Sequence, residues 1–154
     1  MTDRQVHLGS VLATLQLPPH IQVRAWTDTD MPTIQRLSDE NGWPTNHTPE
    51  EVLTSWRNAW PALVATKDDV VIGYVRGLTD SVTILHITDL LVDPKNRIQG
   101  IGRLLLEICY LLYPHTIINL IAEPTAIPFY KAIGYRSVND CFVYYKKLRD
   151  EAKA

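Results

Sequence analysis

The residues best suited to chemistry stand between a strand-like segment and the most regular amphipathic helix of the chain. They are Arg97-Ile98-Gln99-Gly100-Ile101-Gly102-Arg103. A helix N-terminus has unpaired N–H donors and about +0.5 elementary charge, so it attracts a diphosphate. Glycines let phosphate oxygens approach the backbone, and the two arginines add positive charge. On spacing alone an ordinary helix start with solvated arginines is an equal alternative, since the segment matches neither GxGxxG nor a P-loop.

Residue periodicity predicts the two elements that flank this loop. Val82–Val92 is rich in β-branched residues and predicts a strand, which Asp93-Pro94 ends because proline cannot donate to a β-ladder. From Gly100 to Tyr113 apolar residues recur at helical spacing and predict a helix with one buried face. The loop therefore lies at a strand–turn–helix junction.

The other segments predict an alternation of strands and helices. Thr48 and Glu51 form the pattern of a capping box, so a helix should begin there, after an earlier helix capped at Thr29 or Asp30 and ending near 41–42. We also expect strands at 21–24, 62–66, 70–78 and 117–122, a short helix at 126–133 and a closing strand at 141–147. This order predicts an α/β fold (α+β mixed sheet) with helices on both faces.

Composition limits the number of domains and the class of partner. The 154 residues, 45% of them hydrophobic, suit a single domain, which we place at 21–148 after an N-terminal extension of uncertain order at 1–20. A formal charge of −2 argues against nucleic-acid binding. No apolar run reaches the ~20 residues that span a bilayer, and no signal peptide is evident. We therefore expect a cytoplasmic protein without membrane contact.

Two further residue types argue against a disulfide and against a metal site. Cys109 and Cys141 stand in apolar surroundings without CxxC spacing, so we expect buried free thiols in a reducing cytosol. The five histidines are scattered and form no HExxH or Cys/His cluster. We therefore expect no metal cofactor.

Two sequence blocks resemble a known enzyme family. Residues 90–105, which contain the loop, resemble the acetyl-CoA motif Arg/Gln-x-x-Gly-x-Gly/Ala of the GNAT superfamily of N-acetyltransferases. Pro128–Tyr135 resembles that superfamily's Phe-Tyr-x-x-x-Gly-Phe segment, and residues 23–30 resemble its first strand and turn. The resemblance covers about residues 21–147. Ile98 stands where glycine is common, and Glu123-Pro124 occupies the region where many relatives have an asparagine.

The resemblance implies a GNAT-like acyl-CoA N-acyltransferase fold and acetyl-CoA as the acyl donor. It implies that pantetheine pairs with the backbone of Leu90, Leu91 and Val92, where two parallel strands part, and that the diphosphate binds the loop from Arg97 to Arg103. The activity implied is acetyl transfer to a primary amine, with a small cationic or aromatic molecule favoured. Direct attack in a ternary complex is expected, because no nucleophile stands at the loop. The resemblance also allows a homodimer.

Catalytic roles follow from the same resemblance. Tyr130 matches the tyrosine that acts as the acid toward the departing thiolate, although packing beside Phe129 is the structural alternative. The base is left open between His86, Asp89 and ordered water, because Thr88, at a position where relatives place glutamate, lacks basicity. Strict strand alternation would place His86, Thr88, Leu90 and Val92 on one face and Ile87, Asp89 and Leu91 on the other.

The acceptor side is less defined by sequence. Trp43, in the loop between the two early helices, either stacks on the amine or packs in the core, and Asp89 either attracts a cationic substrate or caps nearby backbone. Two other functions are considered: a non-catalytic acyl-CoA-binding regulatory module on the same fold, and a nucleotide-binding α/β domain. Retention of Tyr130, His86 and Asp89 argues against the first, and the missing third glycine argues against the second.

Overall fold

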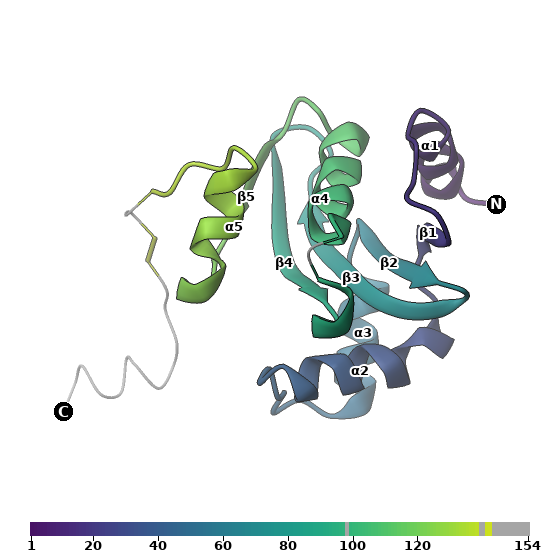
Figure 1. Ribbon diagram of the computed structural model, residues 1–154, viewed down its shortest axis with the longest axis vertical. Coiled ribbons are helices and arrows are strands. Elements are labelled where there is room, and N and C mark those ends of the chain that lie inside the picture. The colour runs from purple at the N-terminus through teal and green to yellow at the C-terminus, as the bar shows by residue number, and fades with distance from the viewer. Residues whose placement is uncertain (98, 139–140, 143–154) are drawn as a thin grey trace. The chain divides into compact units, whose positions relative to one another are not determined.

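A five-stranded sheet forms the centre of the first of two units into which the chain divides, residues 1–121 and 122–154 (Figure 1). The structure is a computed structural model and describes residues 1–97, 99–138 and 141–142. The elements are α1 (Asp3–Leu12), β1 (Ile21–Ala25), α2 (Met31–Glu40), α3 (Pro49–Arg57), β2 (Ala62–Lys67), β3 (Val70–Thr79), β4 (Ile84–Val92), α4 (Ile101–Leu112), β5 (Ile117–Leu120) and α5 (Ile127–Ala132). Short 3₁₀ turns lie at Asp28–Asp30 (η1), Pro94–Asn96 (η2) and Pro124–Ala126 (η3).

The sheet has the strand order β1-β2-β3-β4-β5 and is mixed, as predicted. The first four strands run antiparallel to their neighbours, whereas β4 and β5 are parallel. The parallel pair requires a crossover, which α4 supplies. The five strands of the described residues correspond to five of the predicted ones, and the parallel pair is the one that the family resemblance implied.

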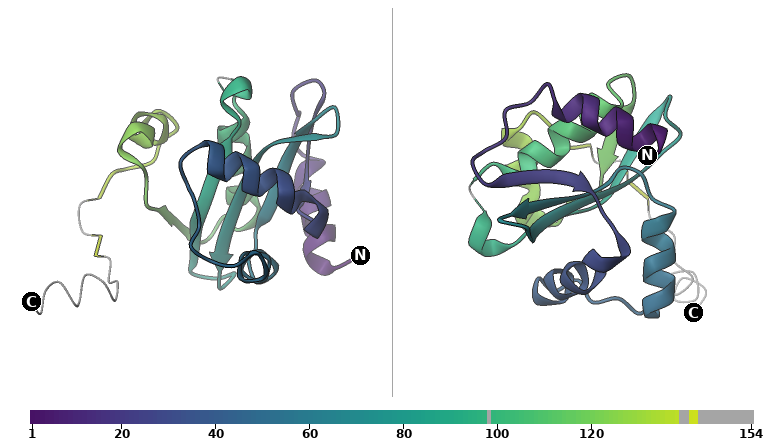
Figure 2. Two further views of the ribbon diagram at one scale, coloured as in Figure 1. Left: turned by 90° about the horizontal axis from the view of Figure 1, so that it is seen from below. Right: turned by 90° about the vertical axis from the view of Figure 1, so that its right-hand side faces the viewer.

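Helices cover both faces of the sheet (Figure 2). Helices α1 and α4 lie on one side, and α2 and α3 lie on the other. Burial on both faces explains why Ala62, Leu63, Val64 and Ala65 of β2 are all inaccessible to solvent although they alternate in direction. In the described residues no helix is long and apolar enough to cross a membrane.

Helix α1 accounts for the segment that sequence reasoning could not place. The side chain of Thr2 accepts from the Gln5 N–H, and the Gln5 side chain accepts from the Thr2 N–H, which is a capping box. Leu8 and Val11 are buried, and α1 packs on α4. Part of the N-terminal extension at 1–20 is therefore an ordered helix that ends at Leu12.

Strand β4 begins two residues later than predicted. The carboxylate of Asp80 accepts hydrogen bonds from the N–H groups of Val82, Thr83 and Ile84 at 2.9, 2.8 and 3.1 Å. This turn holds Val82 and Thr83 out of the ladder with β3. The β-branched composition of the segment did not reveal that the Asp80 turn competes with strand pairing at these two residues.

In the second unit, α5 is the predicted short helix, and Gly134 follows it with φ 96°, as a left-handed C-terminal residue should. Cys141 is exposed, which corrects the expectation of a buried thiol there. Apolar residues flank Cys141 in the sequence, but apolar neighbours along the chain do not ensure that a side chain is buried. Most of the expected closing strand at 141–147 lies outside the described residues.

An ion pair between the exposed Arg24 and the buried Asp30 fixes the chain between β1 and α2. Both Nη atoms of Arg24 donate to the carboxylate of Asp30 at 2.8 Å, and the Thr27 N–H donates to the same carboxylate at 2.8 Å. Asp30 is only 6% exposed. Burial alone would raise its pKa, but the hydrogen bonds from Arg24 and Thr27 outweigh burial and lower it below 3.8.

Replacing Arg24 with alanine should lower the free energy of unfolding at pH 7 by about 3 kcal/mol, because a buried carboxylate loses its partner. The loss should shrink as the pH falls toward 4, since the unpaired Asp30 then takes up a proton in the variant. Urea unfolding at the two pH values measures both effects. Arg36→Ala is the matched control, because its ion pair with Glu40 is exposed and should contribute less than about 1 kcal/mol. Equal losses in the two variants would contradict this account.

Candidate active site

The loop after β4 turns sharply into α4. The Asp93 N–H donates to the Ile72 carbonyl at 2.7 Å, and the Asp93 carboxylate accepts from the Lys95 N–H at 3.1 Å. The turn η2 follows, and Gly100 then precedes α4 with φ 75°. This left-handed conformation favours glycine, so the backbone itself accounts for Gly100.

The N-terminus of α4 can receive an anion. In the described residues no side chain caps its first amides, because the N-cap residue is Gly100. Gln99 and Arg103 are exposed beside these amides, Gly102 adds no side chain, and Ile101 is buried beneath them. Amide donors, a helix dipole and a nearby guanidinium fit a diphosphate. Ile98 lies outside the described residues.

Arg97 ties this loop to the end of α2. Its Nε donates to the Val92 carbonyl at 3.1 Å, and its Nη2 donates to Asn41 Oδ1 at 3.0 Å. Asn41 follows α2 and donates from Nδ2 to the Leu37 carbonyl at 2.8 Å. Sequence reasoning placed Arg97 at the phosphates but missed Asn41, which is 56 residues away in the chain.

Strand β4 extends beyond its pairing with β5. The ladder between them runs from Ile84 opposite Ile117 to Ile87 opposite Leu120. Strand β4 then continues to Val92, still paired with β3 on its other edge. Among the described residues, Leu90, Leu91 and Val92 therefore have no strand partner on the β5 side. This is the free edge that an extended ligand could join.

A β-bulge in β4 corrects the predicted side-chain alternation. Asp89 lies opposite Arg76 and Ile87 lies opposite Gly77, so Thr88 is an extra residue without its own partner in β3. The bulge shifts the alternation by one residue. His86, opposite Leu78, therefore shares a face with Asp89, opposite Arg76, whereas strict alternation had placed them on opposite faces. That face is the one covered by α2 and α3, where Leu91 joins the core.

His86 has a specific partner on β5. The two strands place His86 opposite Asn119, and His86 Nδ1 lies 2.6 Å from Asn119 Oδ1. Asn119 is exposed, and His86 is half-buried. Sequence reasoning named His86 but not Asn119, because no motif contains it.

Asp89 is held by a cation from the neighbouring strand. Arg76 donates to Asp89 Oδ2 through Nε and to Ser55 Oγ through Nη1 at 2.8 Å. Its guanidinium also lies over the Trp56 ring, 5.6 Å from the ring centroid. Thr88 Oγ1 donates toward the Arg76 carbonyl at 3.0 Å and toward Asp89 Oδ2 at 3.1 Å. These contacts hold the bulge in place, and the Arg76 guanidinium compensates the negative charge of the Asp89 carboxylate.

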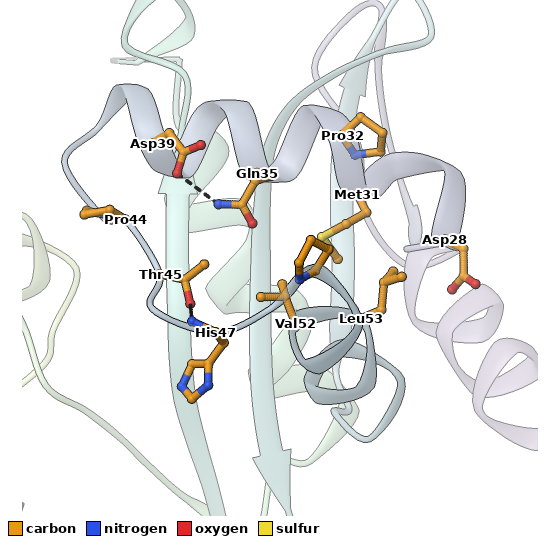
Figure 3. A pocket seen from close by; sticks show the side chains of 11 residues that line it. Asp28, Met31, Pro32, Gln35, Asp39, Pro44, Thr45, His47, Val52 and Leu53 are labelled. Atoms are coloured by element: carbon orange, nitrogen blue, oxygen red, sulfur yellow. Dashed lines mark hydrogen bonds between the residues drawn. The ribbon is translucent and has the colours of Figure 1, made fainter.

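A cavity of about 550 Å³ lies between α2, α3 and the loop that joins them (Figure 3). Its apolar part is formed by Met31, Pro32, Val52 and Leu53. Its polar part is formed by Gln35, Asp39, Thr45 and His47. Trp43 does not line this cavity and packs against the core, while its carbonyl accepts from Ser38 Oγ at 2.9 Å.

Tyr130 belongs to the second unit. It lies in α5, its ring contacts those of Phe129 and Tyr135 with centroids 5.0 and 5.7 Å away, and its carbonyl accepts from the Tyr135 N–H. Burial raises the pKa of the Tyr130 phenol above its ordinary value. The phenol therefore keeps its proton throughout the neutral range.

Cys109 is fully buried in α4, and burial raises the pKa of its thiol to about 12. A thiol of this kind is protonated at neutral pH and is not a nucleophile. No group of three or more side chains able to ligate a metal occurs in the part of the chain that the structure describes.

Similarities to known proteins agree with this geometry. A family model described as "Acetyltransferase (GNAT) domain" matches residues 41–144. A protein of Deinococcus radiodurans R1, provisionally assigned as an acetyltransferase, is 26% identical, with 84% of this chain and 92% of that chain covered and a TM-score of 0.68. An aminoglycoside acetyltransferase from an uncultured soil metagenomic sample, solved with trehalose, is 19% identical, with coverages of 84% and 97% and a TM-score of 0.65.

Naa50 of Arabidopsis thaliana, solved with the bisubstrate analogue CoA-Ac-MVNAL, is 18% identical. The match covers 78% of this chain and 85% of the Naa50 chain, with a TM-score of 0.62. The last two likenesses show the fold alone. The family model spans most of the chain and includes the loop from Arg97 to Arg103, which removes the nucleotide-binding alternative. This protein therefore belongs to the GNAT family of acetyltransferases and is an acyl-transferring enzyme.

Proposed function

We propose that this protein transfers the acetyl group of acetyl-CoA to a primary amine of a small cationic or aromatic molecule by direct attack. The observation that carries the proposal is the corner at which the free edge of β4 leads, through Gly100, into the uncapped N-terminus of α4. Both anion-binding amides and an open strand edge occur there. The cytoplasmic location and the homodimer expected from sequence stay predictions.

The donor would be held along this corner. The first amides of α4, with Arg103 and Arg97 beside them, suit the diphosphate of coenzyme A, and the edge at Leu90–Val92 suits the extended pantetheine arm. Acetyl-CoA supplies an acetyl group activated as a thioester. Main-chain N–H groups on the free edge of β4 would donate to the acetyl oxygen as negative charge develops there.

His86 is the base that we favour. An alkylamine with a pKa near ~10.4 is mostly protonated at pH 7, and its deprotonation costs about 4–5 kcal/mol. A neutral imidazole accepts such a proton near neutrality. Asp89 is a weaker choice, because Arg76 and Thr88 already donate to its carboxylate. We propose that Asp89 instead stabilises the bulge and compensates the charge of Arg76 on this face.

Tyr130 is the acid that we favour, on the basis of its place in the Phe-Tyr-x-x-x-Gly block. A phenol, with an ordinary pKa of about 10, can protonate a departing thiolate, with a pKa of about 8.5, because the two pKa values differ little. The raised pKa of Tyr130 keeps that proton available. The buried Cys109 supports direct attack, because it offers no thiolate for an acyl-enzyme.

The cavity between α2 and α3 supports an acceptor with an apolar body and a hydrogen-bonding or cationic end. Met31, Val52 and Leu53 offer apolar contact, and Asp39 and Thr45 offer polar groups. Asp39 accepts from Gln35 Nε2 at 2.9 Å and has no ion-pair partner among the described residues. Similar folds acetylate different acceptors, so the lining of this cavity is a better guide to the substrate than the fold.

Binding of the donor is tested by Gly102→Asp. The new carboxylate should repel the diphosphate and weaken acetyl-CoA binding at least about tenfold, measured by isothermal titration. Thermal stability should not fall, because an aspartate in the first helical turn is favourable and glycine in a helix is not. Gly102→Ala, which adds a methyl group without charge, is the control, and NAD and ATP are comparison ligands for the unaltered protein. Equal affinity in the two variants would refute diphosphate binding at this helix.

The acid is tested by Tyr130→Phe. Turnover should fall by about 100-fold or more, because the departing thiolate loses its proton donor, while acetyl-CoA affinity stays the same. Since the pKa of Tyr130 is raised, the alkaline loss of wild-type activity due to this group should occur above the ordinary tyrosine value of about 10. Release of free thiol measures the rate. Tyr110→Phe, on the exposed face of α4, is the control. Unchanged turnover in the Tyr130 variant would rule out its role as the acid.

The acceptor cavity is tested by Leu53→Trp. The larger ring should fill part of the cavity and raise the KM for the amine about tenfold, with acetyl-CoA affinity unchanged. The amine is first chosen from a panel of arylalkylamines, polyamines, aminoglycosides and amino acids by thiol release. Thr54→Trp is the control, because Thr54 is exposed on the same helix and does not line the cavity. If both variants have the wild-type KM, the cavity does not receive the acceptor.

A further inference from the structure

His86 and Asn119 form a polar pair in an otherwise apolar stretch of the parallel ladder. Their neighbours in the ladder are Ile84 with Ile117, Leu85 with Ile118 and Ile87 with Leu120. Asparagine is disfavoured in strands, and the apolar run of β5 does not call for it. The pair is one step from the last rung of this ladder, after which β4 continues with β3 as its neighbour and has no strand partner on the β5 side among the described residues.

The contact between the two side chains determines which imidazole nitrogen carries the proton. His86 Nδ1 is 2.6 Å from Asn119 Oδ1, which is a hydrogen-bonding distance. An amide oxygen can only accept, so Nδ1 must donate. In a neutral imidazole the other nitrogen, Nε2, is then the basic atom.

We propose that Asn119 is a positioning residue, which fixes His86 in the Nδ1–H tautomer so that Nε2 is presented as the base. The catalytic part of this statement rests on the proposed acetyl transfer, whereas the tautomer is a property of the protein itself. An amide suits this task because it orients the ring without adding charge. A carboxylate at the same position would stabilise the imidazolium, so a larger share of the ring would already be protonated at neutral pH and could not take up the amine proton.

In the part of the chain that the structure describes, β3 and β4 carry one charged residue each besides His86. On the same face, Arg76 of β3 and Asp89 of β4 are paired with each other. Strand β5 has no titratable side chain from Ile117 to Leu120, and α4 covers the opposite face. Asn119 is therefore the group that acts on His86 most directly.

Nuclear magnetic resonance of the full-length protein labelled with nitrogen-15 tests the tautomer. At a pH where His86 is neutral, the two ring nitrogens have distinct chemical shifts, and His86→Gln assigns its signals by their loss. The wild type should have Nδ1 protonated, and Asn119→Ala should shift His86 toward the Nε2–H form. A wild-type Nε2–H form, or an unchanged spectrum in Asn119→Ala, would overturn the proposal. Asp68→Ala is the matched control, since it removes the partner of His20 at 3.1 Å on the surface.

Kinetics test the consequence for the reaction. Asn119→Ala should lower kcat about tenfold or more with the KM for acetyl-CoA unchanged. Asn119→Asp restores an acceptor for Nδ1 and should move the acidic limb of the pH–rate profile upward by about one pH unit. A profile identical to that of the wild type in Asn119→Asp would count against the proposal. Absence of acetyl transfer in the unaltered protein would instead count against the proposed function and leave the tautomer measurement valid.

Discussion

One extra residue in β4 determines how the candidate active site is arranged. Thr88 has no partner in β3, and the resulting bulge brings His86 and Asp89 onto the same face of the sheet. The Arg76 guanidinium and the Thr88 hydroxyl hold this irregular backbone through contacts with Asp89 and the Arg76 carbonyl. Without the bulge, regular alternation would turn His86 toward the face that α4 covers. The polar chemistry of the site therefore depends on a local defect that the sheet keeps in place.

Local signals in the sequence predicted most of the elements. Helix α4 follows from the spacing of its apolar residues, and α3 follows from the capping box of Thr48 and Glu51, which is present. The mixed sheet follows from the order of the segments. The bulge could not be predicted, because a run of residues from Ile84 to Val92 looks the same with or without one unpaired position. The start of β4 was also missed, since the Asp80 turn competes with the ladder over only two residues.

In the candidate site, too, local features could be predicted from the sequence, whereas long-range contacts could not. The uncapped start of α4 is a local feature, so Gly100 and its neighbours could be named from sequence and from the family motif. The contacts that adjust the site join residues far apart in the chain: Arg97 with Asn41, and His86 with Asn119. Such pairs depend on strand register and on the packing of α2, which the sequence pattern does not specify. Sequence therefore named candidate side chains for the site, but it did not give the contacts that each one makes.

The pairing of Asp89 with Arg76 changes how selectivity for a cationic amine can arise. A free carboxylate beside the base would attract an ammonium ion but would also stabilise its protonated form, which cannot attack. With the charge of Asp89 compensated by Arg76, the proposed base His86 would lower the cost of deprotonation without this face holding the substrate as an ammonium. Attraction for positive charge would then come from Asp39, which has no ion-pair partner among the described residues and lines the cavity between α2 and α3. In the proposed mechanism, separating the recognition of charge from the removal of the proton would let one site both bind a cation and acetylate a neutral amine.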